Sequence, residues 1–465
     1  MNDTGLEQSF TELRLGYADE PYPELPRRLN ALQRVRSLLL ENEPALCEAL
    51  SDDYGYRSAH QSSFAEITTT VKSANHAIKN LKFWMQPERR NTDLSLRMSG
   101  ARSFTQAIPK GVVGIISPWN FPINLTLSPL VSVLAAGNRA LIKPSEITPA
   151  TSSLIAELIA QYFQPTEVAV VCGGVELAQT FIRLPFDHLI YTGGAAIARE
   201  IMRAAADNLV PLTLELGGKS PVVVSDSANL NVVAKRVAFG KYFNAGQICI
   251  APDYLMIGSD KLEEFLLLLM NAVHKADANT GSNTRDSVAI INEHHRQRLQ
   301  NMVNQAEELG ARIIHMGLKN SPYQLFVVID PPEGSLINQQ EIFGPVLTVK
   351  TVNCFEDQIT YIRKQPNPLV IYYFGNNKDE FEQLSTQTRS GSLVKNDIIF
   401  QYANDDLPFG GVGSSGMGKY RGIDGFKEFS HNCAIFKSGF IDVSGLVTPP
   451  YPSWFKVVNN IMRKL

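Results

Sequence analysis

The stretch LTLELGGKSP, residues 212–221, decides how this chain is divided. Before it, short apolar runs typical of strands alternate with runs of helical periodicity. The expected strands are 112–116, 140–142, 168–171 and 188–191, and two of the helices between them are 149–163 and 176–183. After it the alternation starts again, with strands at 221–224 and 253–257 and helices at 230–243 and 261–275. Such alternation predicts parallel, doubly wound sheets, so we expect an α/β protein with a boundary near 212–218.

The size and composition of the chain are those of a globular protein with more than one domain. Its 465 residues exceed what a single hydrophobic core usually serves. The contents of hydrophobic residues, 44%, and charged residues, 19%, are ordinary for such a protein. A net charge of −3 gives no electrostatic reason to expect nucleic acid or an acidic membrane as a partner.

The cysteines and the first residues bear on the cellular compartment. Five cysteines, an odd number without a CxxC pair, argue against a disulfide scaffold and against a zinc cluster. The opening MNDTGLEQSF lacks the basic region and apolar run of a signal peptide. No apolar stretch reaches the roughly 18 residues that a membrane span requires. We therefore expect a cytoplasmic protein without a bound metal.

Glu215 lies between apolar neighbours in the dividing stretch. A carboxylate in such a place is costly unless it has a purpose. Partial burial would raise its pKa toward neutral pH, which suits a general base. The alternative is a carboxylate at a strand edge that faces solvent.

Cys249 ends the string FNAGQIC, residues 243–249. Small residues at the end of a helix can present a sulfur on an exposed bend, beside backbone N–H groups able to bind an oxyanion. A cysteine thiolate is a strong nucleophile, although an isolated cysteine is more often buried and inert. A rival thiol hydrolase would need a supported histidine base, and neither His188 nor His431 lies in such a pattern. His294 and His295 do not have the spacing of a zinc site.

Asn120 follows a predicted buried strand in the string WNFP, residues 119–122. Its side-chain amide offers two uncharged N–H donors, which can stabilise an oxyanion. Taken alone, the string also fits an ordinary turn.

Together these strings resemble the NAD(P)-dependent aldehyde dehydrogenases. The resemblance extends to KPSE at 143–146, YTGG at 191–194, EIFGP at 341–345 and LPFGGVGSSGMG at 407–418, and it covers roughly residues 20–450. The match is strongest to the class 3 group and its bacterial coniferyl aldehyde dehydrogenase-like members. It implies the aldehyde dehydrogenase fold, with a Rossmann-like cofactor domain, an α/β catalytic domain and a small β oligomerisation arm.

The resemblance also implies roles for particular residues. Cys249 would form a thioester intermediate, Asn120 and the Cys249 amide would hold the oxyanion, and Glu215 would activate water. The implied cofactor-binding residues are Ser117, Trp119, Lys143, Glu146, Gly193, Gly194, Leu216, Glu341 and Phe343. Because Glu146 should repel a 2′-phosphate, NAD is favoured, with NADP possible. No GxGxxG fingerprint follows the strands expected in the cofactor domain, and the resemblance implies that this family binds the dinucleotide differently.

The expected organisation follows from the same resemblance. The cofactor-binding domain comprises 1–93 and 109–212, the catalytic domain 213–396, the bridging elements 94–108 and 430–440, the glycine-rich anchor 397–429 and the tail 441–465. Alternating apolar residues at 94–98 and 104–108 predict a hairpin, which together with 430–440 could join two subunits into a homodimer. The tail has a basic, amphipathic pattern, for which docking on protein is favoured over a membrane.

The sequence narrows the reaction more than the substrate. We expect oxidation of an aldehyde to the carboxylic acid, with either an aromatic aldehyde such as coniferyl aldehyde or a medium-chain aliphatic one. Four aromatic residues near the catalytic strings would line an apolar tunnel or belong to the core, namely Phe121, Tyr242, Phe243 and Phe409. The alternatives are a CoA-acylating relative and a dinucleotide-binding protein without catalysis.

Overall fold

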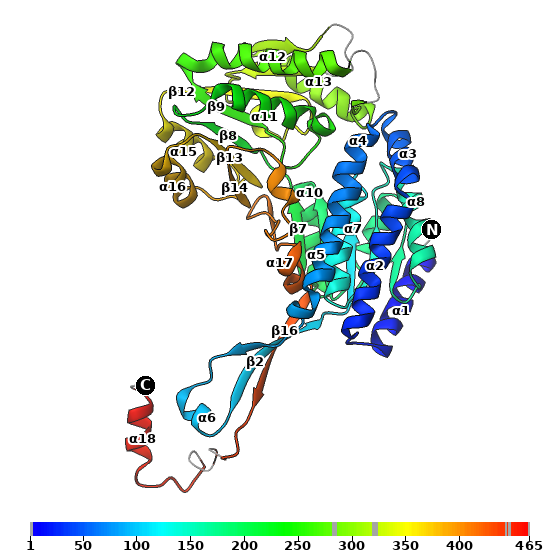
Figure 1. Cartoon of the computed structure of the whole chain (residues 1–465), viewed down its shortest axis with the longest axis vertical. Helices are drawn as coiled ribbons and strands as arrows, with labels where there is room; N and C mark the ends of the chain where they lie inside the picture. The colour runs from blue at the N-terminus through cyan, green and yellow to red at the C-terminus, as the bar shows by residue number, and fades with distance from the viewer. Residues whose placement is uncertain (1–2, 281–285, 319–323, 442–443, 445–447, 464–465) are drawn as a thin grey trace.

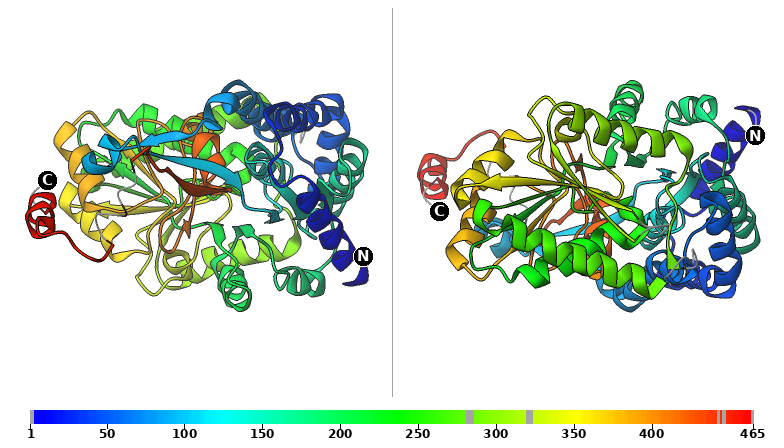
Figure 2. Two further views of the ribbon diagram at one scale, coloured as in Figure 1. Left: turned by 90° about the horizontal axis from the view of Figure 1, so that it is seen from below. Right: turned by 90° about the horizontal axis from the view of Figure 1, so that it is seen from above.

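The computed structural model describes residues 3–280, 286–318, 324–441, 444 and 448–463. Two lobes, each built on one sheet, lie side by side, and a narrow arm projects away from them (Figure 1). The two ends of the chain lie at opposite ends of the molecule (Figure 2).

The first lobe is built on a six-stranded sheet of order β15-β7-β6-β3-β4-β5. Its strands are β3 (Val112–Ile116), β4 (Arg139–Lys143), β5 (Val168–Val170), β6 (His188–Gly193), β7 (Leu212–Leu216) and β15 (Gly416–Met417). All neighbours are parallel except β15 and β7. Buried residues alternate between the two faces, because successive side chains of a strand point to opposite sides. Val112 packs with one hydrophobic cluster and Val113 with another.

Helices cover both faces of this sheet, as its two buried faces require. The helices of the cluster on one face are α1 (Asp3–Asp19), α9 (Val175–Phe181) and α10 (Ala195–Asp207). Those on the other face are α2 (Leu25–Glu41), α3 (Glu43–Tyr54), α5 (Thr69–Trp84), α7 (Asn124–Ala135) and α8 (Pro149–Tyr162). The short helix α4 (Ala59–Ser62) and the π-helix η1 (Ser63–Thr68) precede α5.

The second lobe has a seven-stranded sheet of order β10-β11-β12-β9-β8-β13-β14. Its strands are β8 (Pro221–Val224), β9 (Tyr254–Gly258), β10 (Arg312–Met316), β11 (Leu325–Ile329), β12 (Val346–Val352), β13 (Val370–Phe374) and β14 (Ser392–Lys395). Only β10 runs antiparallel to its neighbour. Its main helices are α11 (Leu230–Tyr242), α12 (Leu262–Thr280), α13 (Glu293–Glu308), α15 (Phe355–Lys364) and α16 (Lys378–Gln387). The predicted α/β class and doubly wound sheets are confirmed.

The chain passes from the first sheet to the second within the stretch LTLELGGKSP, residues 212–221. β7 ends the parallel part of the first sheet at Leu216, and β8 begins the second lobe at Pro221. The change of sheet thus falls between residues 216 and 221. Gly218 has a φ of 157°, and the chain passes between the lobes at this point.

The arm contains a three-stranded antiparallel sheet of β1 (Glu88–Arg90), β2 (Arg102–Pro109) and β16 (Ser430–Lys437). The predicted strand at 94–98 is wrong, because these residues form the helix α6 (Leu94–Met98). Leu94 and Met98 are four residues apart, a spacing that fits one helical face as well as one strand face. Gly100, at a φ of 92°, ends the helix by a C-cap in which its N–H donates to the Arg97 carbonyl.

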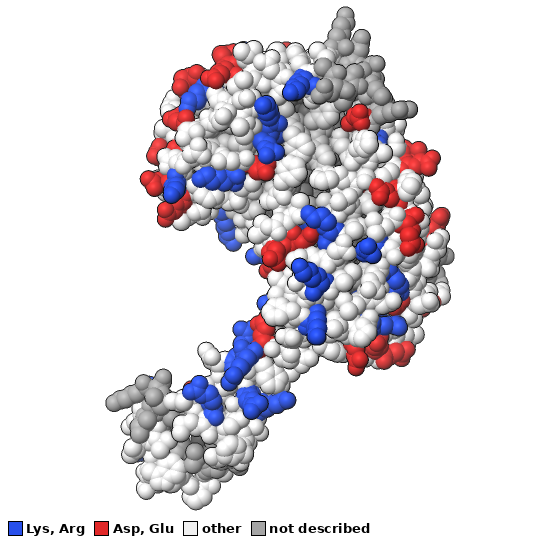
Figure 3. Space-filling model, viewed as in Figure 1, with Lys and Arg blue, Asp and Glu red and all other residues white. Residues whose placement is uncertain are grey.

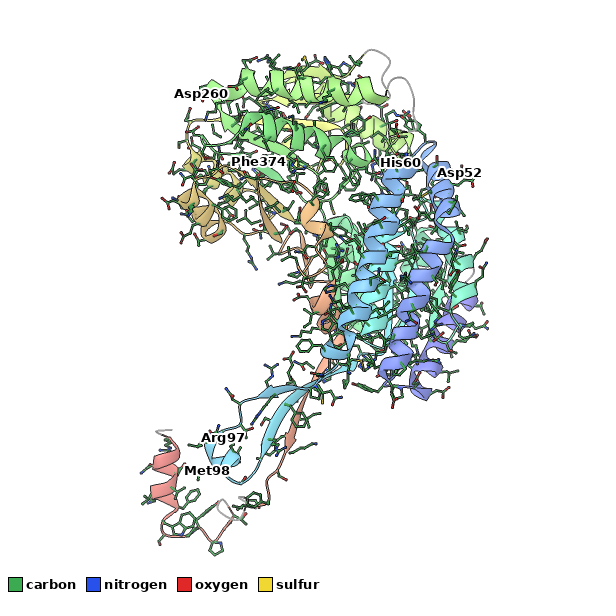
Figure 4. The ribbon with its side chains drawn as sticks, in the orientation of Figure 1. Asp52, His60, Arg97, Met98, Asp260 and Phe374 are labelled. Carbon is green, nitrogen blue, oxygen red and sulfur yellow. The ribbon has the colours of Figure 1, made fainter. Side chains whose placement is uncertain are left out.

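The far end of the arm, with Arg97 and Met98, stands well away from both lobes (Figure 4). Lys and Arg side chains gather along the arm (Figure 3), where Arg89, Arg97, Arg102 and Lys437 line one groove. The tail helix α18 (Phe455–Met462) follows β16, while Lys464 lies outside the described residues. Within the described ranges, no helix has both the length and the apolar character needed to cross a membrane.

Candidate active site

Cys249 follows a turn of unusual backbone conformation at the end of α11. Asn244 and Ala245, in η2 (Phe243–Gly246), have φ angles of 49° and 52°, and Gly246 has 69°. Such left-handed conformations are strained for residues with a Cβ. A Cβ at Gly246 would lie 2.6 Å from the Gly344 carbonyl oxygen, so this position needs glycine. The turn places the partly buried Cys249 thiol at the wall of a cavity.

The buried side chain of Gln247 holds the turn closed. Its Nε2 donates to the carbonyl oxygens of Asn244 and Ala289, both at 3.0 Å, and its Oε1 accepts the N–H of Ile291 at 3.0 Å. Every polar atom of this amide is therefore engaged, which fixes the backbone two residues before Cys249.

Asn120 lies beside the same turn. Its buried amide Nδ2 donates to the carbonyl oxygen of Gln247 at 3.1 Å. An amide nitrogen carries two N–H groups, and the contact with Gln247 uses one of them. The structure thus brings Asn120 and the Cys249 segment together across 127 residues of sequence.

Glu215 is buried on β7, opposite Gly416 of β15, with 3% of its surface exposed. Neither of its carboxylate oxygens has a hydrogen-bond partner among the described residues. Burial, with a smaller effect of the nearby Glu428, raises the pKa of Glu215 well above its ordinary value. An unpaired buried carboxyl of this kind is expected at a functional site, since structural carboxylates are normally paired.

The electrostatic environment of Cys249 links it to two acids. Burial raises the pKa of the thiol, and the carboxylates of Glu341 and Glu215 raise it further. Both acids therefore lie close enough to interact with the sulfur. Because its pKa is raised, the thiol must give up its proton before it can react as a thiolate.

An apolar cavity of about 70 Å³, here called the apolar cavity, has Cys249 in its wall. Of the four aromatic residues expected near it, Phe121, Phe243 and Phe409 line it, and Tyr242 is not among its lining residues. Other walls come from Phe64, Phe239, Ile399, Phe400 and Tyr402. Such a lining accepts a hydrocarbon or aromatic group and positions no charge.

The carboxyl ends of parallel strands of the first sheet meet near this site. Ile116 pairs with Lys143 and with Tyr191, and the N–H of Ser117 donates to the Lys143 carbonyl oxygen at 3.2 Å. Lys143 Nζ donates to Glu146 Oε2 at 2.9 Å. Ligands of open α/β sheets bind at this edge.

Gly193 and Gly194 close β6 and open α10, where Gly194 is the N-cap without a side-chain cap. A Cβ on Gly194 would meet nothing within 4 Å, whereas one on Gly193 would collide with the Tyr191 hydroxyl. The open backbone and free helix N-terminus fit the diphosphate of a dinucleotide.

The segment of Glu341 and Phe343 reaches this edge from the second lobe. A Cβ on Gly217, next to Leu216, would lie 2.0 Å from Glu341 Oε2, so this carboxylate rests against the glycine. Burial, followed by Asp253, raises the pKa of Glu341 to about 8. The rings of Phe343 and Trp119 meet edge to face, with centroids 5.4 Å apart. The predicted cofactor residues of the first lobe thus lie at or shortly after the carboxyl ends of its parallel strands, and Glu341 and Phe343 reach Gly217 and Trp119 from the second lobe. Together these residues, here called the junction residues, fit a dinucleotide.

The chain matches known proteins along almost its entire length. The family model described as "Aldehyde dehydrogenase family" matches residues 22–435. A probable coniferyl aldehyde dehydrogenase of Caulobacter vibrioides is 41% identical over 462 residues, which cover 97% of this chain and 94% of that protein. A coniferyl aldehyde dehydrogenase of Pseudomonas sp. is 43% identical over 455 residues, with 96% and 94% covered. The chain belongs to the aldehyde dehydrogenase family.

Solved structures agree with this aldehyde dehydrogenase in fold. A substrate-bound Staphylococcus aureus AldH is 33% identical, with a TM-score of 0.91 over 99% of this chain and 100% of that one. A Mycobacterium tuberculosis aldehyde dehydrogenase solved with NAD+ is 25% identical, with a TM-score of 0.82 over 93% and 90%. The predicted fold and family are confirmed. This aldehyde dehydrogenase is an NAD(P)-dependent enzyme that oxidises an aldehyde to the acid.

Sequence reasoning missed several buried residues around Asn120. Gln247 had no predicted role beyond membership of the string 243–249, and no role was predicted for Tyr54, Arg57 or Glu66. Glu66 stands between Ala65 and Ile67, so it carries the signal that drew attention to Glu215, an acid among apolar neighbours.

Proposed function

We propose that this aldehyde dehydrogenase oxidises apolar aldehydes, aromatic ones such as coniferyl aldehyde or medium-chain aliphatic ones, with Cys249 as nucleophile. The observation that carries the proposal is the apolar cavity, whose walls are mostly apolar side chains and include Cys249. An aldehyde entering it would place its hydrocarbon part among these side chains and its carbonyl group at the sulfur.

The proposed reaction assigns one step to each of three side chains. The sulfur of Cys249 bonds to the carbonyl carbon as the thiol proton passes to a water molecule. The second N–H of Asn120 and the backbone N–H of Cys249 stabilise the negative oxygen. NAD(P)+, when bound, would supply the hydride acceptor that the oxidation requires, and Cys249 then holds the acyl group as a thioester. Glu215 then takes a proton from water, and the hydroxide displaces the sulfur to release the carboxylic acid.

The proposed cofactor site consists of the junction residues, and NAD is the preferred form. Lys143 and Glu146 would bind the adenosine ribose, Gly193 and Gly194 the diphosphate, and Glu341 the nicotinamide ribose. Ser117, Trp119, Leu216 and Phe343 would shape the pocket around them. The half-exposed Glu146 carboxylate would face a 2′-phosphate with a second negative charge, which supports the preference for NAD.

The organisation drawn from the sequence completes the proposal. Residues 1–93 and 109–212 would bind the cofactor, 213–396 would carry the nucleophile, and 94–108 with 430–440 would join two subunits into a homodimer. The glycine-rich anchor 397–429 and the tail 441–465 would pack on protein, in a cytoplasmic enzyme. The exposed Phe436 and Phe440 on the arm support a protein partner at this surface.

Replacing the nucleophile tests the proposal directly. Cys249→Ala should abolish aldehyde oxidation while NAD binding, followed by fluorescence titration, is retained. Comparing kcat/KM for coniferyl aldehyde, benzaldehyde and linear aldehydes would define the substrate. Free acid as the only product supports Glu215-activated water, whereas acyl-CoA formed in the presence of CoA would identify the CoA-acylating alternative. Oxidation that survives in Cys249→Ala would overturn the assignment.

A further inference from the structure

We propose that Arg57 and Glu66 are positioning residues for the oxidation, a buried ion pair that fixes the Asn120 backbone and so aims the Asn120 amide at the oxyanion. The inference rests on the proposed role of Asn120. It is carried by contacts that converge on the turn at 119–124 from two other parts of the chain.

The carbonyl oxygen of Asn120 accepts three hydrogen bonds. The donors are Arg57 Nη1 at 3.0 Å, the Tyr54 hydroxyl at 3.1 Å and Asn244 Nδ2 at 3.1 Å. A carbonyl oxygen has two lone pairs, so this atom is saturated. Because Asn244 also belongs to the turn before Cys249, these bonds tie the oxyanion donor and the nucleophile segment to one point.

Glu66 fixes the other end of the same turn. Its Oε1 accepts Arg57 Nη2 at 2.8 Å, and its Oε2 accepts the backbone N–H groups of Ile123 at 3.0 Å and Asn124 at 2.7 Å. Asn124 is the first residue of α7, so the carboxylate also caps that helix. The ion pair therefore spans the turn, with Arg57 at Asn120 and Glu66 at the start of α7.

The pair is enclosed by protein. The side chains of Arg57 and Glu66 are 1% and 0% exposed, and the guanidinium lies over the rings of Tyr54, at 4.7 Å, and Phe121, at 5.3 Å. Buried ion pairs are poor stabilisers, since replacement by apolar residues of similar volume is often neutral. Stability alone therefore gives little reason for this arrangement, whereas rigid support of a catalytic amide gives a direct one.

The helix that carries Glu66 is irregular at this place. Residues Ser63–Thr68 form a π-helix between α4 and α5, and such insertions are frequent at functional sites. The same turn contributes Phe64 and Ala65 to the wall of the apolar cavity. One irregular turn thus supplies part of the substrate wall and the carboxylate that supports the Asn120 turn.

A double-mutant cycle tests whether the pair acts through Asn120. Glu66→Gln keeps the volume but replaces one acceptor oxygen by a donor, and it should slow the NAD(P)H burst by about 10- to 100-fold. Asn120→Ala should slow it by about 10²- to 10³-fold. The double variant should be no slower than Asn120→Ala alone, since there is no amide left to position. Multiplication of the two effects would overturn the inference.

Controls separate positioning from general damage. Arg28→Lys alters another buried arginine, which binds the Ala135 carbonyl oxygen at the far end of α7, roughly 16 Å along that helix. Arg28→Lys should leave the burst rate unchanged, even if its melting temperature falls as much as that of Glu66→Gln. A loss of burst rate in Arg28→Lys equal to that in Glu66→Gln would overturn the inference.

A milder variant covers the case in which Glu66→Gln does not fold. Tyr54→Phe removes one donor to Asn120 and should slow the burst severalfold, again only while Asn120 is present. An equal loss in the Asn120→Ala background would overturn the inference. A normal burst in Asn120→Ala itself would instead refute the proposed role of Asn120, and the inference with it.

Discussion

Two buried glutamates belong to the surroundings of the nucleophile segment, and they differ in almost every contact. Glu66 binds Arg57 and two backbone N–H groups, so both of its oxygens are paired. Glu215 has no hydrogen-bond partner for either oxygen among the described residues. Both are raised in pKa chiefly by burial, Glu66 to about 7 despite the opposing effect of Arg57, and Glu215 well above its ordinary value.

The contrast separates two uses of a buried acid. A fully paired carboxylate rigidifies the elements that it joins, as Glu66 joins η1 to the turn at 119–124. An unpaired carboxylate keeps its lone pairs for a water molecule or a transferred proton. We therefore assign geometry to Glu66 and proton transfer to Glu215, and variants of these two residues and of Glu146 test that division.

The largest effect is expected for Glu215→Gln. Steady-state turnover should fall by about 10²- to 10⁴-fold, because no base remains to activate water for thioester hydrolysis. A stoichiometric burst of NAD(P)H should persist, in contrast to Glu66→Gln, in which the burst itself slows. Stopped-flow absorbance at the nicotinamide band distinguishes the two. If Glu215→Gln turned over at the normal rate, the division would collapse.

The second prediction concerns stability. Glu66→Ala should lower the free energy of unfolding by about 3–5 kcal/mol, because it leaves Arg57 buried without its partner. Glu215→Ala breaks no pair among the described residues, so its loss should be smaller. Urea denaturation of both variants, followed by tryptophan fluorescence, provides the comparison. Equal losses would show that Glu215 has a structural partner after all.

The fold was largely predictable because its signals are local. Strand–helix alternation and the Gly217-Gly218 pair need only neighbouring residues, and both lobes were anticipated from them. The error at 94–98 was also local. Leu94, Leu96 and Met98 alternate as in a strand, and Leu94 and Met98 also share one face of a helix. The helix α1 (Asp3–Asp19) was not among the predicted elements.

The site was predictable only where its residues stand in distinctive strings. Glu215 was found through the glycine pair that follows it and its match to a family. Glu66 shows the same acid-among-apolar signal, but two of its partners are 57 and 58 residues away. No local pattern encodes such contacts. The π-helix that carries Glu66 has only six residues, too few to leave a periodic pattern in the sequence. The support of the site could therefore be recognised only in three dimensions.

A third, smaller effect is the pH dependence of stability. The raised pKa of Glu215 means that the unfolded chain ionises at lower pH than the native protein. Its contribution to stability is present below the unfolded pKa of about 4.3 and is lost as pH rises through the folded pKa. Between these two pKa values, the free energy of unfolding of the wild type should fall relative to that of Glu215→Gln by about 1 kcal/mol per pH unit. Melting temperatures from pH 5 to 8 measure the difference, and parallel curves would contradict it.

The smallest effect is expected at Glu146, a glutamate that lies between the two extremes. Its side chain is 44% exposed and paired with the buried Lys143 Nζ at 2.9 Å, so solvent screens its charge more than that of either buried acid. Glu146→Gln should therefore raise kcat/KM for NADP relative to NAD by only about two- to fivefold, the size of a partly exposed charge interaction. The NAD(P)H burst with NAD should be unchanged, since Glu146 neither positions Asn120 nor transfers a proton. If Glu146→Gln slowed the burst as Glu66→Gln does, Glu146 would also help to position the catalytic residues. The division between paired and unpaired acids would then have to place Glu146 with Glu66.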